Sequence, residues 1–111
     1  MIYRLDLNNE PFNWIKTKRK TIEMRIVKDN RKDMIPGDYI FFTNNKTGEE
    51  MKVVITFVHF YKDFEELYKY EDTKSLGYEE NQKTSYKDMF FYYKEEDIKR
   101  CGVMAIGVTL L

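Results

Sequence analysis

The chain has few of the residues that build metal centres and disulfides. Its 111 residues include one cysteine, Cys101, and one histidine, His59. One cysteine excludes a disulfide within the chain and any metal site made of cysteines alone, and one histidine does not make a zinc site. We therefore expect no metal, no cofactor and a reducing compartment. Apolar neighbours surround Cys101 in the sequence and favour a buried, inert thiol.

The chain also lacks a net charge and a long apolar run. It carries 19 basic and 19 acidic residues, which excludes attraction of the molecule as a whole to nucleic acid or to anionic lipid. No apolar segment approaches the about 18 residues of a membrane span, and the start has no long apolar region typical of a secretory signal. We expect a cytoplasmic protein without a membrane segment, and the sequence leaves its oligomeric state open.

Aromatic side chains are abundant, with 9 Tyr, 8 Phe and one Trp in a chain that is 42% hydrophobic. This composition predicts one small domain, residues 1–111, with a core filled by rings. Alternation and apolar runs predict strands, and caps and helical spacing predict helices, so the fold class is α+β. The expected strands are 2–7, 21–26, 39–43, 51–61 and 103–110, and the expected helices are 9–17, 63–70, 85–93 and 94–100.

The charges are unevenly distributed along the chain. Between Lys16 and Lys32 there are eight basic residues against two acidic ones, and between Lys62 and Asp97 there are 11 acidic residues against 6 basic ones. The folded protein is therefore expected to carry a positive patch and a negative region, unless these charges are simply solvated faces.

Residues 18–26, within the basic segment between Lys16 and Lys32, combine charged side chains with the alternation of apolar and polar residues that is typical of a strand. Thr21, Glu23 and Arg25 share one face of the expected strand. Lys20 has the opposite parity, so it is expected to point toward the mouth of the barrel and away from Glu23, unless the strand begins with a bend. Arg25 is the best candidate for a phosphate or base-edge contact, because its guanidinium is always charged and forked. The alternative is an ordinary ion pair between Arg25 and Glu23.

The order of the segments resembles an ASCH domain of the PUA-like superfamily. The resemblance rests on Pro11-Phe12, Ile15-Lys16, the 18–25 stretch, 36–42, 61–67, Leu76-Gly77-Tyr78 and Tyr92-Tyr93 ahead of 102–106. It implies a small PUA-like mixed β-barrel with flanking helices. The family motif, approximately Gly-x-Lys-x-x-Glu-x-Arg, is matched here by Lys20, Glu23 and Arg25, with Lys18 in place of the glycine.

The resemblance also implies candidate site residues and two kinds of function. RNA or a nucleotide would bind in a cleft lined by Lys18, Arg19, Lys20, Thr21, Glu23 and Arg25. Some bacterial relatives are instead amidohydrolases that deacetylate N4-acetylcytidine with a Lys-Thr-Glu triad, and others are thought to cleave RNA. Lys20 falls on the triad lysine and Glu23 on its threonine, so these two are the catalytic candidates. The triad glutamate would come from Glu65, Glu66, Glu71 or Glu79.

Three hypotheses follow from the residues and the resemblance together. The first is an RNA- or nucleotide-binding module, in which Lys20 and Arg25 engage phosphate and Glu23 accepts hydrogen bonds from a base or ribose. Tyr78, beside Gly77 in a polar loop, is the candidate for stacking on an unpaired base. The second is a small hydrolase of a modified nucleoside or of RNA, so the sequence leaves open whether the chain is an enzyme. The third is a protein-interaction domain that uses the acidic helices.

Overall fold

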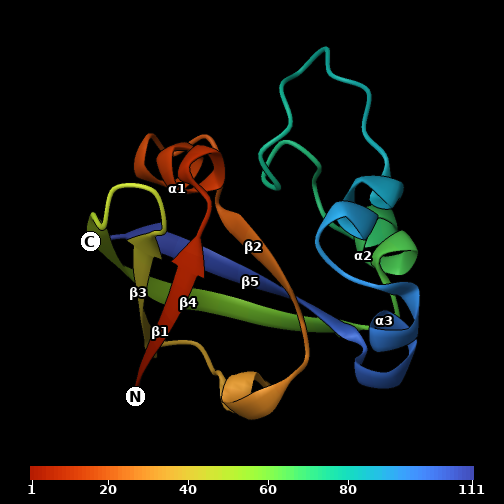
Figure 1. The fold of residues 1–111 in the computed structure, drawn as a ribbon, viewed down its shortest axis with the longest axis horizontal. Coiled ribbons are helices and arrows are strands. Elements are labelled where there is room, and N and C mark those ends of the chain that lie inside the picture. The colour runs from red at the N-terminus through yellow and green to blue at the C-terminus, as the bar shows by residue number, and fades with distance from the viewer.

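The computed structural model describes all residues, 1–111, as one curled sheet with helices packed on its rims (Figure 1). The strands are β1 (Ile2–Leu7), β2 (Ile22–Ile26), β3 (Tyr39–Asn44), β4 (Glu50–Tyr61) and β5 (Val103–Leu110). The helices are α1 (Asn9–Lys16), α2 (Phe64–Tyr70) and α3 (Glu95–Cys101), together with the short 3₁₀ helices η1 (Asp29–Asp33) and η2 (Tyr86–Phe91). The α+β class and the barrel-like sheet with flanking helices are confirmed.

The five strands form a half-barrel with the order β1-β3-β4-β5-β2. β1 pairs in parallel with β3, and the other neighbours are antiparallel. A register shift lies between Ile55 and Phe57 of β4. Opposite it, a Cβ on Gly107 would lie 2.2 Å from the Phe57 ring, so the ring occupies the space of the missing side chain. Such an irregularity increases the local twist and helps the sheet to curl.

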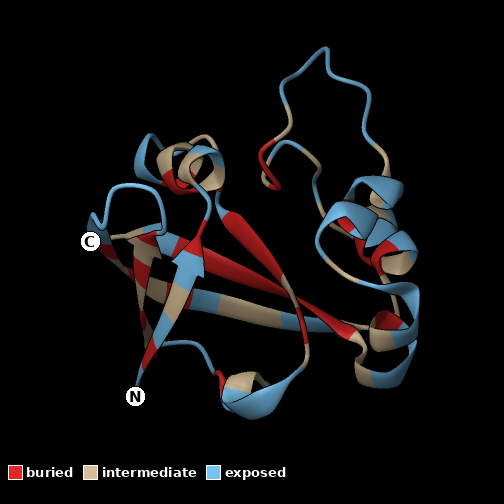
Figure 2. Ribbon diagram, viewed as in Figure 1, coloured by how far each residue is buried: buried red, intermediate tan, exposed pale blue.

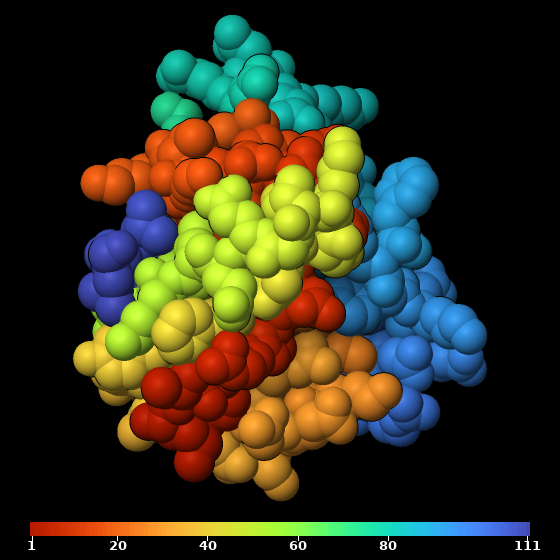
Figure 3. Space-filling model, turned by 60° about the vertical axis from the view of Figure 1, so that its left-hand side comes forward, coloured from red at the N-terminus to blue at the C-terminus, as the bar shows by residue number.

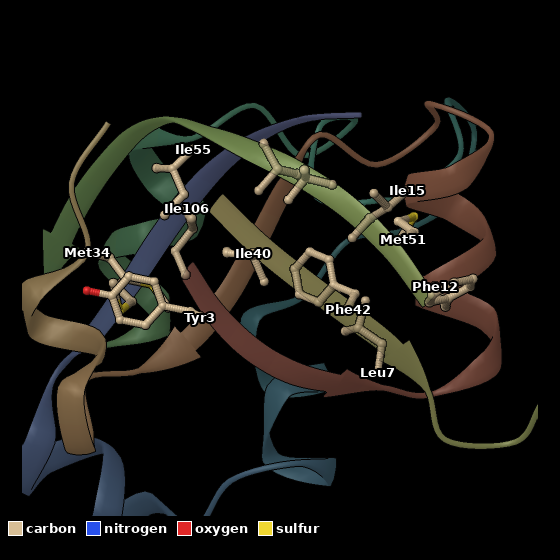
Figure 4. Packing of buried hydrophobic residues seen from close by; sticks show 13 residues of the cluster. Tyr3, Leu7, Phe12, Ile15, Met34, Ile40, Phe42, Met51, Ile55 and Ile106 are labelled. Carbon is tan, nitrogen blue, oxygen red and sulfur yellow. The ribbon is translucent and has the colours of Figure 1, made fainter. Parts of the chain in front are cut away.

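Two hydrophobic clusters stabilise this arrangement, and Figure 2 shows their buried residues along the strands. The first fills the inside of the half-barrel, where Tyr3, Ile40, Phe42 and Ile106 are among the side chains that converge in Figure 4. The second lies between the sheet and the helical side, and it includes Phe64 and Leu67 of α2, Ile98 of α3 and Met89 of η2.

Local sequence signals account for most helix boundaries. Asp63 caps α2, where its Oδ1 accepts a hydrogen bond of 2.9 Å from the Glu66 N–H. Gly102 ends α3 with φ +71°, a conformation that glycine adopts easily. α1 begins at Asn9, the predicted start of the first helix, and buries Phe12 and Ile15.

The structure corrects several expected elements. Residues 85–93 form only the short 3₁₀ helix η2 rather than a full helix, and the expected loop after β2 contains η1. The apolar run of β3 predicts a strand covered on both faces, but burial alternates along it, with Ile40, Phe42 and Asn44 inward. Cys101 is only half-buried.

Candidate functional site

A cavity of about 300 Å³ lies where the half-barrel is open, between the end of β1 and the strand β2. Side chains of β1, α1, β2, α2 and η2 line it, and the loop between α2 and η2 supplies one wall. In Figure 2 this loop turns a buried segment, at Leu76 and Gly77, toward α1 and β2. The charged residues in the lining are Asp6, Lys20, Glu23, Arg25 and Asp88.

Three of these charges form one buried cluster. Lys20 Nζ lies 3.1 Å from Glu23 Oε1, and Arg25 Nε donates a hydrogen bond of 2.8 Å to Glu23 Oε2. The Glu23 side chain is 5% exposed, so both of its oxygens are held by cations away from bulk water. Burial by itself would raise the pKa of Glu23, but the charges of Lys20 and Arg25 outweigh burial and hold the pKa below its ordinary value.

Arg25 also connects the two edges of the half-barrel. Its Nη2 donates a hydrogen bond of 2.8 Å to the backbone oxygen of Asp6 in β1. β1 and β2 stand at opposite ends of the strand order, so one side chain spans the opening. Because Nε and one N–H of Nη2 are engaged, three of the five guanidinium N–H groups have no partner within the protein.

Lys20 has the orientation expected when a bend precedes the strand, because its side chain points toward Glu23. β2 starts at Ile22, and Lys18 has φ +68°, which turns the chain just before the strand. The Lys20 N–H donates to the Trp14 carbonyl of α1 rather than to a neighbouring strand. Strand parity therefore does not apply to Lys20, and its side chain turns toward Glu23. Lys18 stands where the family motif has glycine, at a backbone angle that favours glycine.

The alternation of residues 21–26 predicts a half-buried strand with its charged face toward solvent, and this prediction is wrong. Glu23 is buried along with Ile22, Met24 and Ile26, so both sides of β2 are covered. Only Arg25 keeps some exposure, 15% of its side chain. Ile22, Met24 and Ile26 pack in the cluster under the helices. Glu23 and Arg25 lie opposite Ile106 and Met104 of β5, so they face the inside of the half-barrel, where Arg25 reaches Asp6 of β1.

The remaining candidates of the 18–25 stretch lie outside the cavity lining. Lys18 and Thr21 are exposed to solvent. Arg19 stacks over the Trp14 ring at 4.5 Å from its centroid and donates a hydrogen bond of 2.9 Å from Nε to the Gly77 carbonyl. Arg19 thus connects the loop between α2 and η2 to α1. A role of Arg19 in ligand binding stays a prediction.

Tyr78 lies in the cavity wall, where it is part of a hydrogen-bonded chain. Its hydroxyl donates to Asp88 Oδ2 at 2.6 Å and lies 2.9 Å from the Tyr68 hydroxyl. Burial, followed by the bond to Asp88, raises the pKa of Tyr78 far above its usual range. Burial also raises the pKa of Tyr68 to about 12. Both hydroxyls therefore stay protonated, with Tyr68 donating to Tyr78 and Tyr78 to Asp88.

Sequence reasoning missed several of the lining residues. Trp14, Tyr92 and Tyr93 line the cavity beside Tyr68 and Tyr78. The sequence marks Tyr92 and Tyr93 as part of the resemblance to an ASCH domain, and as members of an aromatic run expected to be mostly core with one or two rings at the rim of the cleft. The sequence could have indicated that Trp14 lines the site, because Trp14 lies next to the buried residues Phe12 and Ile15 of α1 but is not one of them. No feature of the sequence indicated that Asp6 or Asp88 lines the cavity.

None of the four glutamates considered for the triad lines the cavity. Glu79 pairs with Arg19 at 3.5 Å, and the Glu71 carboxylate accepts from Tyr61 and lies 2.7 Å from His59 Nδ1. The later carboxylate that does line the cavity is Asp88. No group of three or more potential ligands could hold a metal ion, and none of the helices has the length and apolar character needed to cross a membrane.

The fold and the cavity together define a class: small half-barrel domains with a charged, aromatic-walled cavity at the opening of the sheet. The chain belongs to the ASCH domain family, whose family description matches residues 5–111. The family is generally linked to RNA binding.

Two solved structures have the same fold. The hypothetical archaeal protein PH0355 is 27% identical, with a TM-score of 0.84 and full coverage of both chains. Protein PF0455 from Pyrococcus furiosus is 29% identical, with a TM-score of 0.74, and the match covers 100% of this chain and 98% of that protein. No curated protein matches the chain significantly.

Proposed function

We propose that this protein binds RNA or a nucleotide and that the cavity receives one base. The observation that carries the proposal is the buried Lys20–Glu23–Arg25 cluster in an aromatic-walled cavity. Free guanidinium donors recognise the oxygen and nitrogen acceptors of a base edge. The aromatic residues around them suit a flat ring, which proteins commonly stack on tyrosine or tryptophan.

The size of the cavity supports a small ligand or a single unit of a larger one. A volume of about 300 Å³ is at the lower end of the range for ligand pockets. A base within a duplex could not enter it, since the base would have to leave its stack first. An unpaired nucleotide therefore fits the proposal better than double-stranded nucleic acid.

The charge balance in the cavity supports a neutral base inside and phosphate outside. The lining carries two cations, Lys20 and Arg25, against three carboxylates, Asp6, Glu23 and Asp88. Glu23 already occupies both cations, so an additional phosphate deep in the cavity would face an excess of negative charge. Of the two contacts that the sequence suggested for Arg25, a phosphate or a base edge, we therefore assign the base edge.

Arg25→Ala tests this assignment. We expect binding of ribonucleosides, ribonucleotides and a short unpaired RNA to weaken at least about tenfold, because a specific side-chain contact to a base is worth about 1–3 kcal/mol. Isothermal titration calorimetry measures the affinities, and circular dichroism checks that the variant is folded. Arg25→Lys keeps the positive charge but loses the forked guanidinium group, so it can replace Arg25→Ala in this test if the alanine variant is unstable.

The matched control is Arg4→Ala. Arg4 is an exposed arginine of β1 that pairs with Glu50 and stacks on Phe41, away from the cavity. This variant should bind as the native protein does. Unchanged binding by the folded Arg25 variants would exclude the cavity as the nucleotide site.

A second candidate function is hydrolysis, and one observation favours it: Lys20 is buried in the cavity beside Glu23. The resemblance places the amidohydrolase lysine at this position. Against it, Glu23 is an ionised carboxylate bound on both sides, and a Lys20 that remains charged stabilises anions but cannot accept a proton. Incubation with N4-acetylcytidine decides the matter, since deacetylation that disappears in Lys20→Ala would establish turnover.

A further inference from the structure

An exposed aromatic surface continues from the cavity onto the outside of the molecule. Tyr92 both lines the cavity and is 60% exposed, and its neighbour Phe91 is 91% exposed. Phe90 is less exposed and packs edge-to-face on Tyr86, with ring centroids 6.1 Å apart. No ring packs on Phe91 within the protein. Phe90, Phe91 and Tyr92 thus form a run of exposed rings that reaches the cavity, and contiguous exposed apolar surface is typical of a binding site.

Basic residues lie at both ends of β2, on either side of the cavity. Before the strand stand Lys18 and Arg19, and after it, on and beside η1, stand Lys28, Arg31 and Lys32. A strand of five residues is about 16 Å long. The two basic groups are therefore too far apart for one nucleoside to reach both, whereas a short strand of RNA can.

The surroundings of the aromatic surface set the direction in which a strand would leave the cavity. α3 begins with Glu95, Glu96 and Asp97, which repel phosphate. On the other side is η1, whose last turn carries the basic residues Arg31 and Lys32. In Figure 3 the orange segment with η1 lies next to the blue segment with η2 and α3.

We infer that the ligand is a segment of single-stranded RNA longer than one nucleotide. One base occupies the cavity, the next base stacks on Phe91 and Tyr92, and the backbone phosphates lie along the basic residues at the two ends of β2. This inference rests on the proposed function and goes beyond it, because it selects unpaired RNA over a free nucleoside as the ligand. The continuity of the aromatic surface with the cavity and the positive charge beside it favour this occupant over a protein.

The experiment compares a ribonucleoside, an unpaired RNA of about eight nucleotides and the same RNA in a duplex, each titrated into the full chain. We expect the unpaired RNA to bind at least tenfold more tightly than both the nucleoside and the duplex. Phe91→Ala should weaken binding of the unpaired RNA about 5- to 100-fold, the usual effect of losing one stacked base. It should leave nucleoside binding unchanged. Because Phe91 is almost wholly exposed, this substitution does not threaten folding.

Two further variants make the test specific. Phe60→Ala is the matched control, because Phe60 is also an exposed phenylalanine but lies on β4, outside the cavity lining. Lys28→Ala with Lys32→Ala should reduce the slope of log RNA affinity against log salt by about 0.7 for each phosphate that is no longer neutralised. The slope for the nucleoside should not change.

The outcomes separate this inference from the function on which it rests. If a nucleoside binds as tightly as the unpaired RNA, or if Phe91→Ala leaves RNA affinity unchanged, the inference is overturned and the aromatic surface belongs to another partner, such as a protein. The proposed function survives that result when the nucleoside still binds and Arg25→Ala abolishes its binding. If no nucleoside, nucleotide or RNA binds, both proposals fail.

Discussion

At the scale of single residues, the buried carboxylate of Glu23 determines the character of the cavity. It is ionised although it is buried, because Lys20 and Arg25 each contact one of its oxygens. The cluster therefore carries one net positive charge with Glu23 at its centre. Removing any member leaves a buried charge without its partner, which is costly in a medium of low dielectric constant.

Glu23→Gln should lower the free energy of unfolding at pH 7 by roughly 3–5 kcal/mol, the usual cost of breaking a buried ion pair. Because the folded-state pKa of Glu23 lies below the unfolded value near 4.3, its contribution is complete above that value and is lost as the pH falls through the folded pKa. Urea unfolding from pH 7 to pH 3 measures both effects.

The native protein and the Glu23→Gln variant should therefore become more alike in stability as the pH falls. Some pH dependence should remain in the variant, since the N-terminal ammonium, followed by the backbone of Ile35, also lowers the pKa of Asp38. A difference in stability that stays constant across this range would mean that Glu23 is not paired as described.

At the scale of elements, the loop between α2 and η2 completes the cavity. The Ser75 carbonyl accepts the N–H groups of Thr21 and Ile22 at 2.9 Å each, so the loop pairs with the start of β2. Two residues further on, Gly77 packs against the Trp14 ring. The loop therefore aligns the cavity walls contributed by α1 and β2 with those contributed by η2.

Gly77→Ala should displace this wall. Gly77 has φ +112°, and an added Cβ would lie 3.0 Å from Trp14 Cε3, so the substitution strains the backbone and crowds the ring. We expect a loss of about 1–3 kcal/mol in stability, together with weaker nucleotide binding. Thermal unfolding and titration calorimetry measure the two effects.

Gly37→Ala provides the comparison. Gly37 has φ +93° but no atom within 4 Å of an added Cβ, so the alanine variant should lose stability through the backbone alone and bind normally. Equal effects of both substitutions on binding would show that contact between the loop and Trp14 does not matter for the site.

At the scale of the whole molecule, β5 unites the two hydrophobic clusters. Its side chains alternate between them: Met104, Ile106 and Val108 belong to the cluster inside the half-barrel, and Val103 and Ala105 to the cluster under the helices. β5 is also paired on both edges, with β4 and β2. Because one strand serves both clusters, neither can be lost without disturbing the other.

We therefore expect the protein to unfold as one unit. Phe42→Ala in the first cluster and Phe64→Ala in the second should each reduce stability by about 3–5 kcal/mol, and each variant should still show a single transition. Unfolding followed by far-ultraviolet circular dichroism and by Trp14 fluorescence measures this. Two separate transitions would contradict the expectation of one domain, residues 1–111.

Local patterns in the sequence predicted much of the fold. The alternation of β1, the cap at Asp63 and the stop at Gly102 depend on side chains and backbone preferences within a few residues of one another. Where contacts across the molecule compete with local preference, prediction failed. The aromatic run 85–93 has helical spacing, yet only η2 forms there because its side chains pack against separate elements, as Asp88 does with Tyr78 and Tyr93 with Phe64.

For the candidate site, too, the sequence predicted the local features and only the tertiary structure decided the long-range contacts. The charged residues of the 18–25 stretch were recognisable because they are close in sequence, and the sequence by itself determined which chemical groups the stretch carries. Only the tertiary structure decided that Lys20 turns toward Glu23, that Arg25 reaches Asp6, and that Trp14 and Asp88 join the cavity. These placements depend on where the chain turns before β2 and on how the half-barrel closes, and such long-range geometry leaves no pattern in the neighbouring residues.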